Sequence, residues 1–306
     1  FALWREREEL PTALRDLLVA LEPFDRLAVT MTGELCDCYS SKEEGVLHIL
    51  AAVEEATATP PQFWLLDEGL CDLEKARAEP LQAAAANWQA LSTWAAGLGG
   101  NEDSLLIDIG STTTDIIRLE GGKPRAAGRT DPERLQLGEL VYTGVRRTPV
   151  CALLEEADLK GQACPLAAEH FATSLDAWLL LEEIPEDPDC LSTADGRPAT
   201  RRMAQDRLAR MLCLDPQELE EKDALSLARQ IALAQENKIC RAIGKVIEQG
   251  KPGGAFISGE GEFLALRALQ SLGLEDDLVT PMSRTCEPAG SEAACAFALA
   301  RLAAES

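Results

Sequence analysis

The chain has 306 residues and a formal net charge of −23 at pH 7, from 29 lysines and arginines against 52 aspartates and glutamates. Hydrophobic residues make up 46% of it and charged residues 26%, which fits a globular protein and excludes collagenous, coiled-coil and disordered classes. The acidic charge repels phosphate backbones, so nucleic acid is excluded as a partner. No apolar stretch approaches the roughly 18 residues of a membrane span, so no membrane partner is expected.

The side chains available for chemistry are unevenly distributed. Ten cysteines are scattered without CxxC pairing, and we expect them to be reduced and mostly buried. The chain has only two histidines, His48 and His170, which leaves few ligands for a zinc site and few bases for a histidine-based triad. No signal peptide is visible, which together with the thiols favours the cytoplasm.

Helical and strand patterns alternate over the first hundred residues. Helical spacing of apolar residues predicts helices over 5–21, 43–56 and 87–98. Short β-like runs predict strands over 26–32 and 63–66. The length of the whole chain allows about two domains, and this alternation predicts that the first of them is α/β.

The pattern changes at Ser104. A strand over 105–107 runs into a turn of small residues, residues 115–119 form the second arm of a hairpin, and Gly121-Gly122 closes it. A helix-poor stretch follows from 123 to 149. Helices are then expected over 201–213, 224–247, 261–272 and 291–304, with a strand over 254–257.

The sharpest motif is the turn of that hairpin, an acid before and after a run of glycine and hydroxyl residues. Gly110 lets the backbone approach a phosphate, and the following amides and hydroxyls form an anion nest. The residues of this nest are Ser111, Thr112, Thr113 and Thr114. Asp108 and Asp115 would hold Mg²⁺, directly or through water. The alternative is an ordinary hairpin turn with Ser and Thr capping.

A second glycine turn joins a strand to a helix. Ser258, Gly259 and Gly261 stand where a phosphate meets the amides of a helix N-terminus. A tight strand-to-helix connection, capped by Ser258 or Glu260, explains the same residues. The two turns together are typical of one known architecture.

The two turns resemble those of the actin, sugar-kinase and Hsp70 superfamily, and the first resembles its hydantoinase/oxoprolinase-like branch. The blocks 31–38, 138–149 and 193–198 are similar to the family of proteins linked to tetrahydromethanopterin-dependent one-carbon transfer. The resemblance implies an α/β, two-lobed actin-like (ribonuclease H-like) ATPase fold with an interlobe cleft. The first lobe would span 1–100 plus 289–306, without the family's N-terminal strand and first phosphate loop, and the second 101–288.

The resemblance also implies an activity: a transferase that condenses an aminomethylfuran diphosphate with the phenol of tyramine or γ-glutamyltyramine, releasing diphosphate, in methanofuran or methylofuran synthesis. Such a reaction needs stabilisation of the departing charge, for which Arg134, Arg146 and Arg147 are candidates beside Mg²⁺ and the loop amides. The alternative is that these arginines are solvated surface residues.

The phenol needs a carboxylate that accepts its proton, and Glu34, Asp37 and Glu139 are candidates that spacing does not rank. Glu34 and Asp37 are explained almost as well as turn acids that cap the following helix. Asp195 and Arg197 are expected to line the substrate cleft. Expected partners are therefore a small-molecule diphosphate, a phenolic amine and a second copy of the chain in a homodimer.

Two other classes of function stay open from the sequence. One is an ATP-dependent small-molecule kinase or a hydantoinase/oxoprolinase-like hydrolase, which ATP turnover would distinguish from the transferase. The other is a non-catalytic nucleotide-binding regulator. The fold alone does not choose among them, because this superfamily carries several chemistries on one scaffold.

Overall fold

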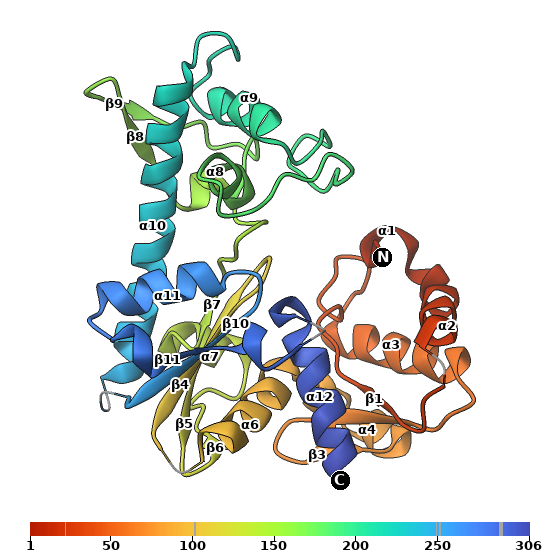
Figure 1. Cartoon of the computed structure of the whole chain (residues 1–306). Helices are drawn as coiled ribbons and strands as arrows, with labels where there is room; N and C mark the ends of the chain where they lie inside the picture. Colours follow the sequence, from red (N-terminus) through yellow and green to blue (C-terminus); the bar gives the residue numbers. More distant parts are fainter. Residues whose placement is uncertain (22, 101, 249, 251, 288–289) are drawn as a thin grey trace. The chain divides into compact units, whose positions relative to one another are not determined.

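The computed structural model describes residues 1–21, 23–100, 102–248, 250, 252–287 and 290–306, and it divides into two compact units (Figure 1). Unit 1 comprises residues 1–101, 121–124 and 293–306, and unit 2 comprises residues 102–120 and 125–292. The sequence-based division placed its boundaries at 100/101 and 288/289, within a few residues of these. The short segment 121–124, which groups with unit 1, was not anticipated.

Unit 1 is an α/β body built on a small sheet. Its strands are β1 (Leu27–Val29), β2 (Pro61–Leu65) and β3 (Gly69–Cys71), in the order β1-β2-β3. Strands β1 and β2 are parallel, and β2 and β3 are antiparallel. Because β2 is the central strand of the order, β1 and β3 are the edge strands among the described residues. The helices are α1 (Leu3–Glu6), α2 (Leu10–Leu21), α3 (Lys42–Ala56), α4 (Leu73–Ala78), α5 (Pro80–Ala83), α6 (Asn87–Gly99) and α12 (Ala294–Glu305).

The core of unit 1 forms where α3 packs on the sheet. Ser41 caps α3 by accepting a hydrogen bond from the amide of Glu44 at 3.1 Å. From there the apolar face of the helix meets the inner face of β2, where Phe63 and Leu65 are fully buried. The returning helix α12 packs against α6, and the ring of Phe297 meets Trp94 edge-on at 5.3 Å between centroids.

Unit 2 is built on a mixed sheet whose order is β11-β10-β4-β5-β6, with β7 paired to β5. The strands of this sheet that belong to unit 2 are β4 (Ser104–Ile109), β5 (Thr114–Glu120), β7 (Leu140–Val141), β10 (Gly254–Ser258) and β11 (Val279–Pro281), whereas β6 (Lys123–Pro124) is part of the segment 121–124 that groups with unit 1. Strand β4 is antiparallel to β5 and parallel to β10, with Asp108 opposite Ser258. Because parallel strands end at the same edge of a sheet, the turns after β4 and after β10 are neighbours.

The helices of unit 2 cover the sheet and build a subdomain that Figure 1 shows above α11. That subdomain includes the antiparallel pair β8 (Glu156–Leu159) and β9 (Gln162–Pro165), together with the N-terminal part of the long helix α10. The helices are α7 (Asp131–Leu137), α8 (Ser174–Leu180), α9 (Arg201–Met211), α10 (Glu221–Ile247) and α11 (Glu262–Ser271). Short 3₁₀ turns lie at Arg7–Glu9, Val150–Ala152, Asp276–Leu278, Met282–Arg284 and Ser291–Ala293.

The structure corrects the predicted elements in three places. The helix expected over 5–21 is split by the 3₁₀ turn, since α2 begins at Leu10 and accommodates Pro11 in its first turn, where a missing N–H costs nothing. The stretch 123–149 holds α7, which a capping box at Thr130 starts. Helix α8 and the β8–β9 pair were not anticipated. Among the described residues, no helix is both long and apolar enough to cross a bilayer.

A buried ion pair joins α8 to α9. Asp176 accepts a hydrogen bond from Nε of Arg207 at 2.7 Å and another from the amide of Thr173 at 2.9 Å, and both charged side chains are at most 1% exposed. Removing one partner of such a pair leaves a buried charge without compensation.

We expect Asp176→Ala to lower the free energy of unfolding by about 3 kcal/mol, because the buried Arg207 would keep only its longer, 3.2 Å contact with Asp195 to compensate its charge. Urea unfolding followed by circular dichroism measures this. Lys222→Ala, which removes a solvent-exposed ion pair with Glu220, is the control and should leave the midpoint in place. Equal midpoints for the two variants would contradict the structural role of the pair.

Candidate functional site

Three turns of unit 2 converge at the carboxyl ends of β4 and β10, and we call them the three-turn site. Turn A (110–113) links β4 to β5, turn B (143–148) follows β7, and turn C (259–261) links β10 to α11. Turn A closes with a hydrogen bond from the amide of Gly110 to the carbonyl of Thr113 at 3.0 Å. The parallel pairing of β4 with β10 brings turns A and C together.

Turn B lies directly against turn A. The amide of Val145 donates to the carbonyl of Gly110 at 3.0 Å, and the amides of Arg146 and Arg147 donate to the carbonyl of Ser111 at 3.1 and 2.9 Å. A Cβ atom at Gly144 would lie 2.4 Å from both the Gly110 oxygen and the Thr112 nitrogen. Only glycine therefore permits this approach of the two turns.

Turn C meets turn A through two further glycines. The amide of Gly261 donates to the carbonyl of Ile109 at 2.9 Å. Gly259 has a φ of +87°, and a Cβ atom there would lie 2.3 Å from the Ile109 oxygen and 2.8 Å from Oδ1 of Asp108. Gly259 and Gly261 were predicted to bind phosphate, and the structure shows what else they do: they let turn C approach β4 closely.

A buried hydrogen-bonded chain supports turn B from behind. Nε2 of Gln235 in α10 donates to Oγ1 of Thr143 at 2.9 Å and to the carbonyl of Gly144 at 2.8 Å, and its Oε1 accepts from Nε1 of Trp178 at 2.9 Å. The hydroxyl of Ser174 also donates to the Gly144 carbonyl, at 2.8 Å. Sequence reasoning missed these residues, although a glutamine among the apolar residues of a predicted helix was an available signal.

The hydroxyls of turn A differ in their surroundings. Ser111, Thr112 and Thr113 are half-buried at the tip of the hairpin, with the Ser111 and Thr112 hydroxyl oxygens 3.4 Å apart. Thr114 is fully buried, and its hydroxyl donates to the carbonyl of Thr143 at 2.8 Å. Ser258 is also fully buried. Three hydroxyls of the predicted phosphate loop thus stay at its tip, while Thr114 and Ser258 lie within the fold.

Asp108 and Asp115 stand opposite each other on the β4–β5 pair, but their partners differ. Oδ1 of Asp115 accepts from Arg134 at 2.6 Å, and Arg134, only 2% exposed, also donates to the carbonyl of Glu139 at 3.2 Å. Burial raises the pKa of Asp115, and the Arg134 guanidinium opposes that rise. Asp115 and Arg134 form an ion pair that joins β5 to α7, and the predicted contacts of Asp115 with Mg²⁺, directly or through water, and of Arg134 with phosphate stay predictions.

Glu139 also has a structural place. Its carboxylate oxygens accept from the amides of Ala127 at 2.6 Å and Gly128 at 2.9 Å, and the side chain is 4% exposed. A carboxylate that anchors two backbone amides holds the segment before α7 in position. That Glu139 also accepts the phenolic proton stays a prediction.

The two arginines of turn B have different surroundings. Nε of Arg146 donates to both carboxylate oxygens of Glu260 at 2.6 and 2.7 Å, so this pair ties turn B to turn C. Arg147 is exposed, and its backbone amide is fixed on Ser111. Of the three predicted arginines, Arg147 is the one with an exposed side chain, and its backbone lies against turn A.

A cavity of about 590 Å³ opens beside turn C. Glu262 at its wall accepts from the amide and hydroxyl of Ser283 at 2.8 and 2.7 Å, and Ser291 accepts from the amide of Gly259 at 2.9 Å. The cavity wall includes the aromatic ring of Phe263 and the side chains of three glutamates, next to the turns that were predicted to bind phosphate. Its wall consists of Gly259, Glu260, Glu262, Phe263, Ser283, Gly290, Ser291 and Glu292.

The donor set fits a magnesium ion rather than a metal held by protein groups alone. Among the described residues, no group of three or more His, Cys, Asp or Glu side chains is arranged to hold a metal. Mg²⁺ is typically bound by one or two carboxylates with water and substrate phosphate oxygens. Asp108 is half-buried at the end of β4 beside turns A and C, and its predicted contact with Mg²⁺ stays a prediction.

The other predicted site residues lie elsewhere. Glu34 and Asp37 belong to unit 1, where Glu34 is 2% exposed and its carbonyl lies so close to Gly45 that a Cβ there would be 2.3 Å away. Asp37 is exposed. Their part in proton transfer stays a prediction.

Asp195 and Arg197 lie in the helical subdomain of unit 2. Asp195 accepts from Nε of Arg197 at 2.7 Å and from Arg207 at 3.2 Å. Burial acts to raise the pKa of Asp195, but hydrogen bonds from Arg197 and Arg207 outweigh it and hold that pKa below its usual range. These contacts stabilise the turn before α9, and the predicted contact with substrate stays a prediction.

The sequence pattern of the hydantoinase/oxoprolinase family matches residues 25–306 of the chain. The chain belongs to the hydantoinase/oxoprolinase family. This hydantoinase/oxoprolinase-family chain is 31% identical over 269 residues to the (4-{4-[2-(gamma-L-glutamylamino)ethyl]phenoxymethyl}furan-2-yl)methanamine synthase of Methanocaldococcus jannaschii, covering 88% of the chain and 80% of the relative. It is 33% identical over 172 residues to the synthase of the same name from Methanococcus vannielii, covering 56% of the chain and 77% of the relative.

Solved structures agree on the fold. The nucleotide-free structure of acetone carboxylase, described as performing ATP-dependent acetone carboxylation, superposes with a TM-score of 0.56 at 15% identity. It covers 96% of this hydantoinase/oxoprolinase-family chain, which spans about half, 49%, of the acetone carboxylase chain. The likeness confirms the predicted α/β actin-like fold class, and at this identity it concerns the fold alone.

We expect Gly144→Ala to lower the free energy of unfolding by about 1–3 kcal/mol and to displace turn A. The added methyl group would overlap with backbone atoms of Gly110 and Thr112. Thermal unfolding and amide exchange at residues 110–113 measure the two effects. Gly244→Ala in α10 is the matched control, since a Cβ there meets nothing within 4 Å and alanine favours the helix. A Gly144→Ala protein as stable as the control would contradict the close approach of turns A and B.

Proposed function

We propose that this chain is a transferase of methanofuran-type cofactor synthesis that joins an aminomethylfuran diphosphate to the phenol of tyramine or γ-glutamyltyramine. The observation that carries the proposal is the shared name of the two curated relatives, at 31% and 33% identity, which describes a phenoxymethyl-furan ether. The three-turn site supports it, because glycine turns with hydroxyls and an exposed arginine suit the departing diphosphate.

The reaction breaks the bond between the furfuryl-type carbon and a diphosphate oxygen and forms a bond between that carbon and the phenolic oxygen. The furan ring delocalises the positive charge that develops on the carbon, so the protein chiefly stabilises the leaving group and positions the phenol. The phenolic proton passes to a carboxylate, and the electron pair of the broken bond leaves with diphosphate. Atoms and charge balance without a further reactant.

In this scheme turn A is the diphosphate cradle. The hydroxyls of Ser111, Thr112 and Thr113 are at its tip, and Arg147 adds a guanidinium that matches two phosphate oxygens. Asp108 would hold Mg²⁺, which neutralises the departing charge when bound. Arg146 acts differently from our sequence-based expectation, since it holds turns B and C together through Glu260.

The proton acceptor, the location and the assembly belong to the same proposal. Glu34, Asp37 and Glu139 are its candidates for the acceptor, and Asp195 and Arg197 its candidates for contacts with the phenolic amine. A cytoplasmic location and a homodimer are proposed on the sequence alone.

Incubation with aminomethylfuran diphosphate, Mg²⁺ and each phenol, followed by mass spectrometry of the ether and a diphosphate assay, tests the reaction. ATP turnover without ether would instead favour a kinase or hydrolase.

We expect Asp108→Asn to lower kcat for ether formation by about 10²–10³, because the amide cannot hold the cation beside the leaving diphosphate. Chelation of Mg²⁺ should abolish the activity of the unchanged protein. Asp103→Asn, an exposed position just before β4, is the control and should keep full activity. Full activity of Asp108→Asn in the presence of Mg²⁺ would remove Asp108 from the site.

We expect Arg147→Ala to lower kcat/KM for the diphosphate substrate by about 10- to 100-fold, and Arg147→Lys to recover part of the loss, because an ammonium keeps the charge without the bidentate geometry. Steady-state kinetics at two salt concentrations measures this. Arg241→Ala, an exposed arginine of α10, is the control for a change of net charge. If both alanine variants lost activity equally, the loss would reflect net charge and not contact with the substrate.

A further inference from the structure

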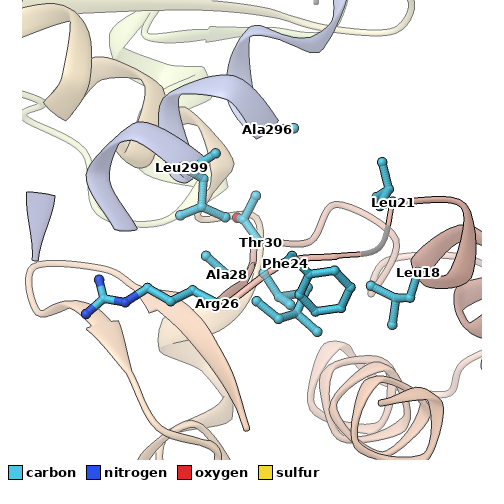
Figure 2. A pocket seen from close by; sticks show the side chains of 11 residues that line it. Leu18, Leu21, Phe24, Arg26, Ala28, Thr30, Ala296 and Leu299 are labelled. Atoms are coloured by element: carbon cyan, nitrogen blue, oxygen red, sulfur yellow. The ribbon is translucent and has the colours of Figure 1, made fainter. Parts of the chain in front are cut away.

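The side chains that the two units enclose are mostly apolar, and one amide of unit 2 departs from that pattern. In unit 1, the cavity of about 370 Å³ in Figure 2 is lined by apolar side chains apart from Arg26 and Thr30. In unit 2, the buried face of α10, a helix that the structure describes in full, is apolar at every position except Gln235, which is fully buried. Burying an amide costs free energy unless its hydrogen bonds are made.

The amide of Gln235 is held in one orientation. Its Nε2 donates to Oγ1 of Thr143 at 2.9 Å and to the carbonyl of Gly144 at 2.8 Å, which uses both of its N–H groups. Its Oε1 accepts from Nε1 of Trp178 at 2.9 Å. Because an indole N–H can only donate, it keeps the amide oxygen on the side of α8 and directs both N–H groups at turn B.

The indole that sets this orientation is itself held by a second helix. Trp178 is fully buried in α8, and the ring of Phe263 from α11 meets it edge-on at 5.0 Å between centroids. The guanidinium carbon of Arg267, also in α11, lies 5.8 Å from the centroid of the Trp178 ring. Helices α8 and α11 thus fix the indole, and the indole fixes the amide.

The atoms of turn B that Gln235 contacts have other partners as well. Ser174 donates to the carbonyl of Gly144 at 2.8 Å, and the hydroxyl oxygens of Thr143 and Thr148 are 3.0 Å apart. An apolar side chain in place of Gln235 would therefore leave both atoms of turn B hydrogen-bonded. What would be lost is the pair of hydrogen bonds that fixes turn B on α10.

The same turn carries the donors that hold turn A. The amide of Val145 donates to the carbonyl of Gly110 at 3.0 Å, and the amide of Arg147 donates to the carbonyl of Ser111 at 2.9 Å. The position of turn B relative to α10 therefore sets where turn A and the backbone of Arg147 stand. Preorganised donors of this kind act on a leaving group without a cost of reorganisation.

We propose that Gln235 is a positioning residue for the departing diphosphate: it fixes turn B, and with it Arg147 and turn A, through an amide of one orientation. This inference rests on the proposed transferase reaction and deepens it. Gln235 does not touch the substrate in this scheme. It acts through the turn backbone, where a displacement on the order of 1 Å can cost on the order of 10²-fold in rate.

A pair of glutamines in α10 provides the test and its control. Gln235→Met keeps the length of the side chain, but its thioether cannot donate to turn B. Gln230→Met is the matched variant, because the Gln230 amide also makes two bonds to backbone, accepting from the amide of Asp158 at 2.7 Å and donating to its carbonyl at 3.0 Å. Those bonds hold β8, away from the three-turn site.

We expect Gln235→Met to lower kcat for ether formation by about 10- to 100-fold, because the displaced groups contact the leaving diphosphate. The KM for the phenol should stay within about twofold, and Gln230→Met should keep both constants. Should Gln235→Met fail to fold, Trp178→Phe removes the N–H that orients the amide and keeps an aromatic ring beside Phe263. Its kcat should fall in the same way with the KM for the phenol unchanged.

Amide hydrogen exchange in the full chain is the second measurement, and it needs no substrate. Exchange at residues 145–147 should be at least about fivefold faster in Gln235→Met than in Gln230→Met, because turn B is no longer fixed on α10. Exchange in the core of β4 should be equal in the two variants, which shows that the sheet is intact.

Three results would overturn the proposal. A kcat of Gln235→Met, or of Trp178→Phe in its place, equal to that of Gln230→Met would show that the amide does not position the site. A loss confined to the KM for the phenol would place its effect elsewhere. Equal exchange at 145–147 would show that turn B keeps its place without Gln235. If the unchanged chain forms no ether, the transferase proposal fails, and the exchange measurement still decides whether Gln235 positions turn B.

Discussion

The three-turn site depends on a steric constraint: backbone atoms of turns A and B are in contact where a side chain would stand. Gly144 packs against the backbone of Gly110 and Thr112, and Gly259 packs against Ile109 in the same manner. The parallel pairing of β4 with β10 makes this meeting possible, and the absent Cβ atoms let it become close. Backbone amides thereby gather at one edge of the sheet, where their dipoles are held by the fold and need no reorganisation when charge develops.

The chain is acidic overall, so the arginines of unit 2 have many carboxylates to pair with. Two arginines near the three-turn site are neutralised by carboxylates, Arg134 by Asp115 and Arg146 by Glu260, and in the helical subdomain Asp195 neutralises Arg197. These pairs stabilise junctions between elements, since each joins segments that are separate in the sequence or closes a turn. In the proposed reaction, an anionic substrate would therefore depend on the hydroxyls of turn A and on Arg147, within a surface that repels it elsewhere.

Sequence reasoning reached the fold class and the two glycine turns that meet in unit 2, but not the contacts of individual charged residues. The glycine and hydroxyl pattern of 108–115 has a local cause, so turn A could be predicted from its own residues. The partner of Asp115 could not, because Arg134 reaches it from α7, in a stretch that the sequence presented as helix-poor. Glu139 was likewise chosen by its place in a motif, whereas its contacts with Ala127 and Gly128 depend on how the chain folds back.

Helix α10 gives the site a mechanical property. It extends 27 residues from the helical subdomain to the sheet, and Gln235 along its length holds the carbonyl of Gly144 through a side-chain amide whose other end is fixed by Trp178. Such an amide has a direction, because its oxygen and its nitrogen cannot exchange partners. Because both ends of the Gln235 amide are fixed, a rotation or tilt of α10 would be transmitted through this side chain to the backbone of turn B. The helical subdomain is thus coupled through Gln235 to turn B, whose backbone is hydrogen-bonded to turn A.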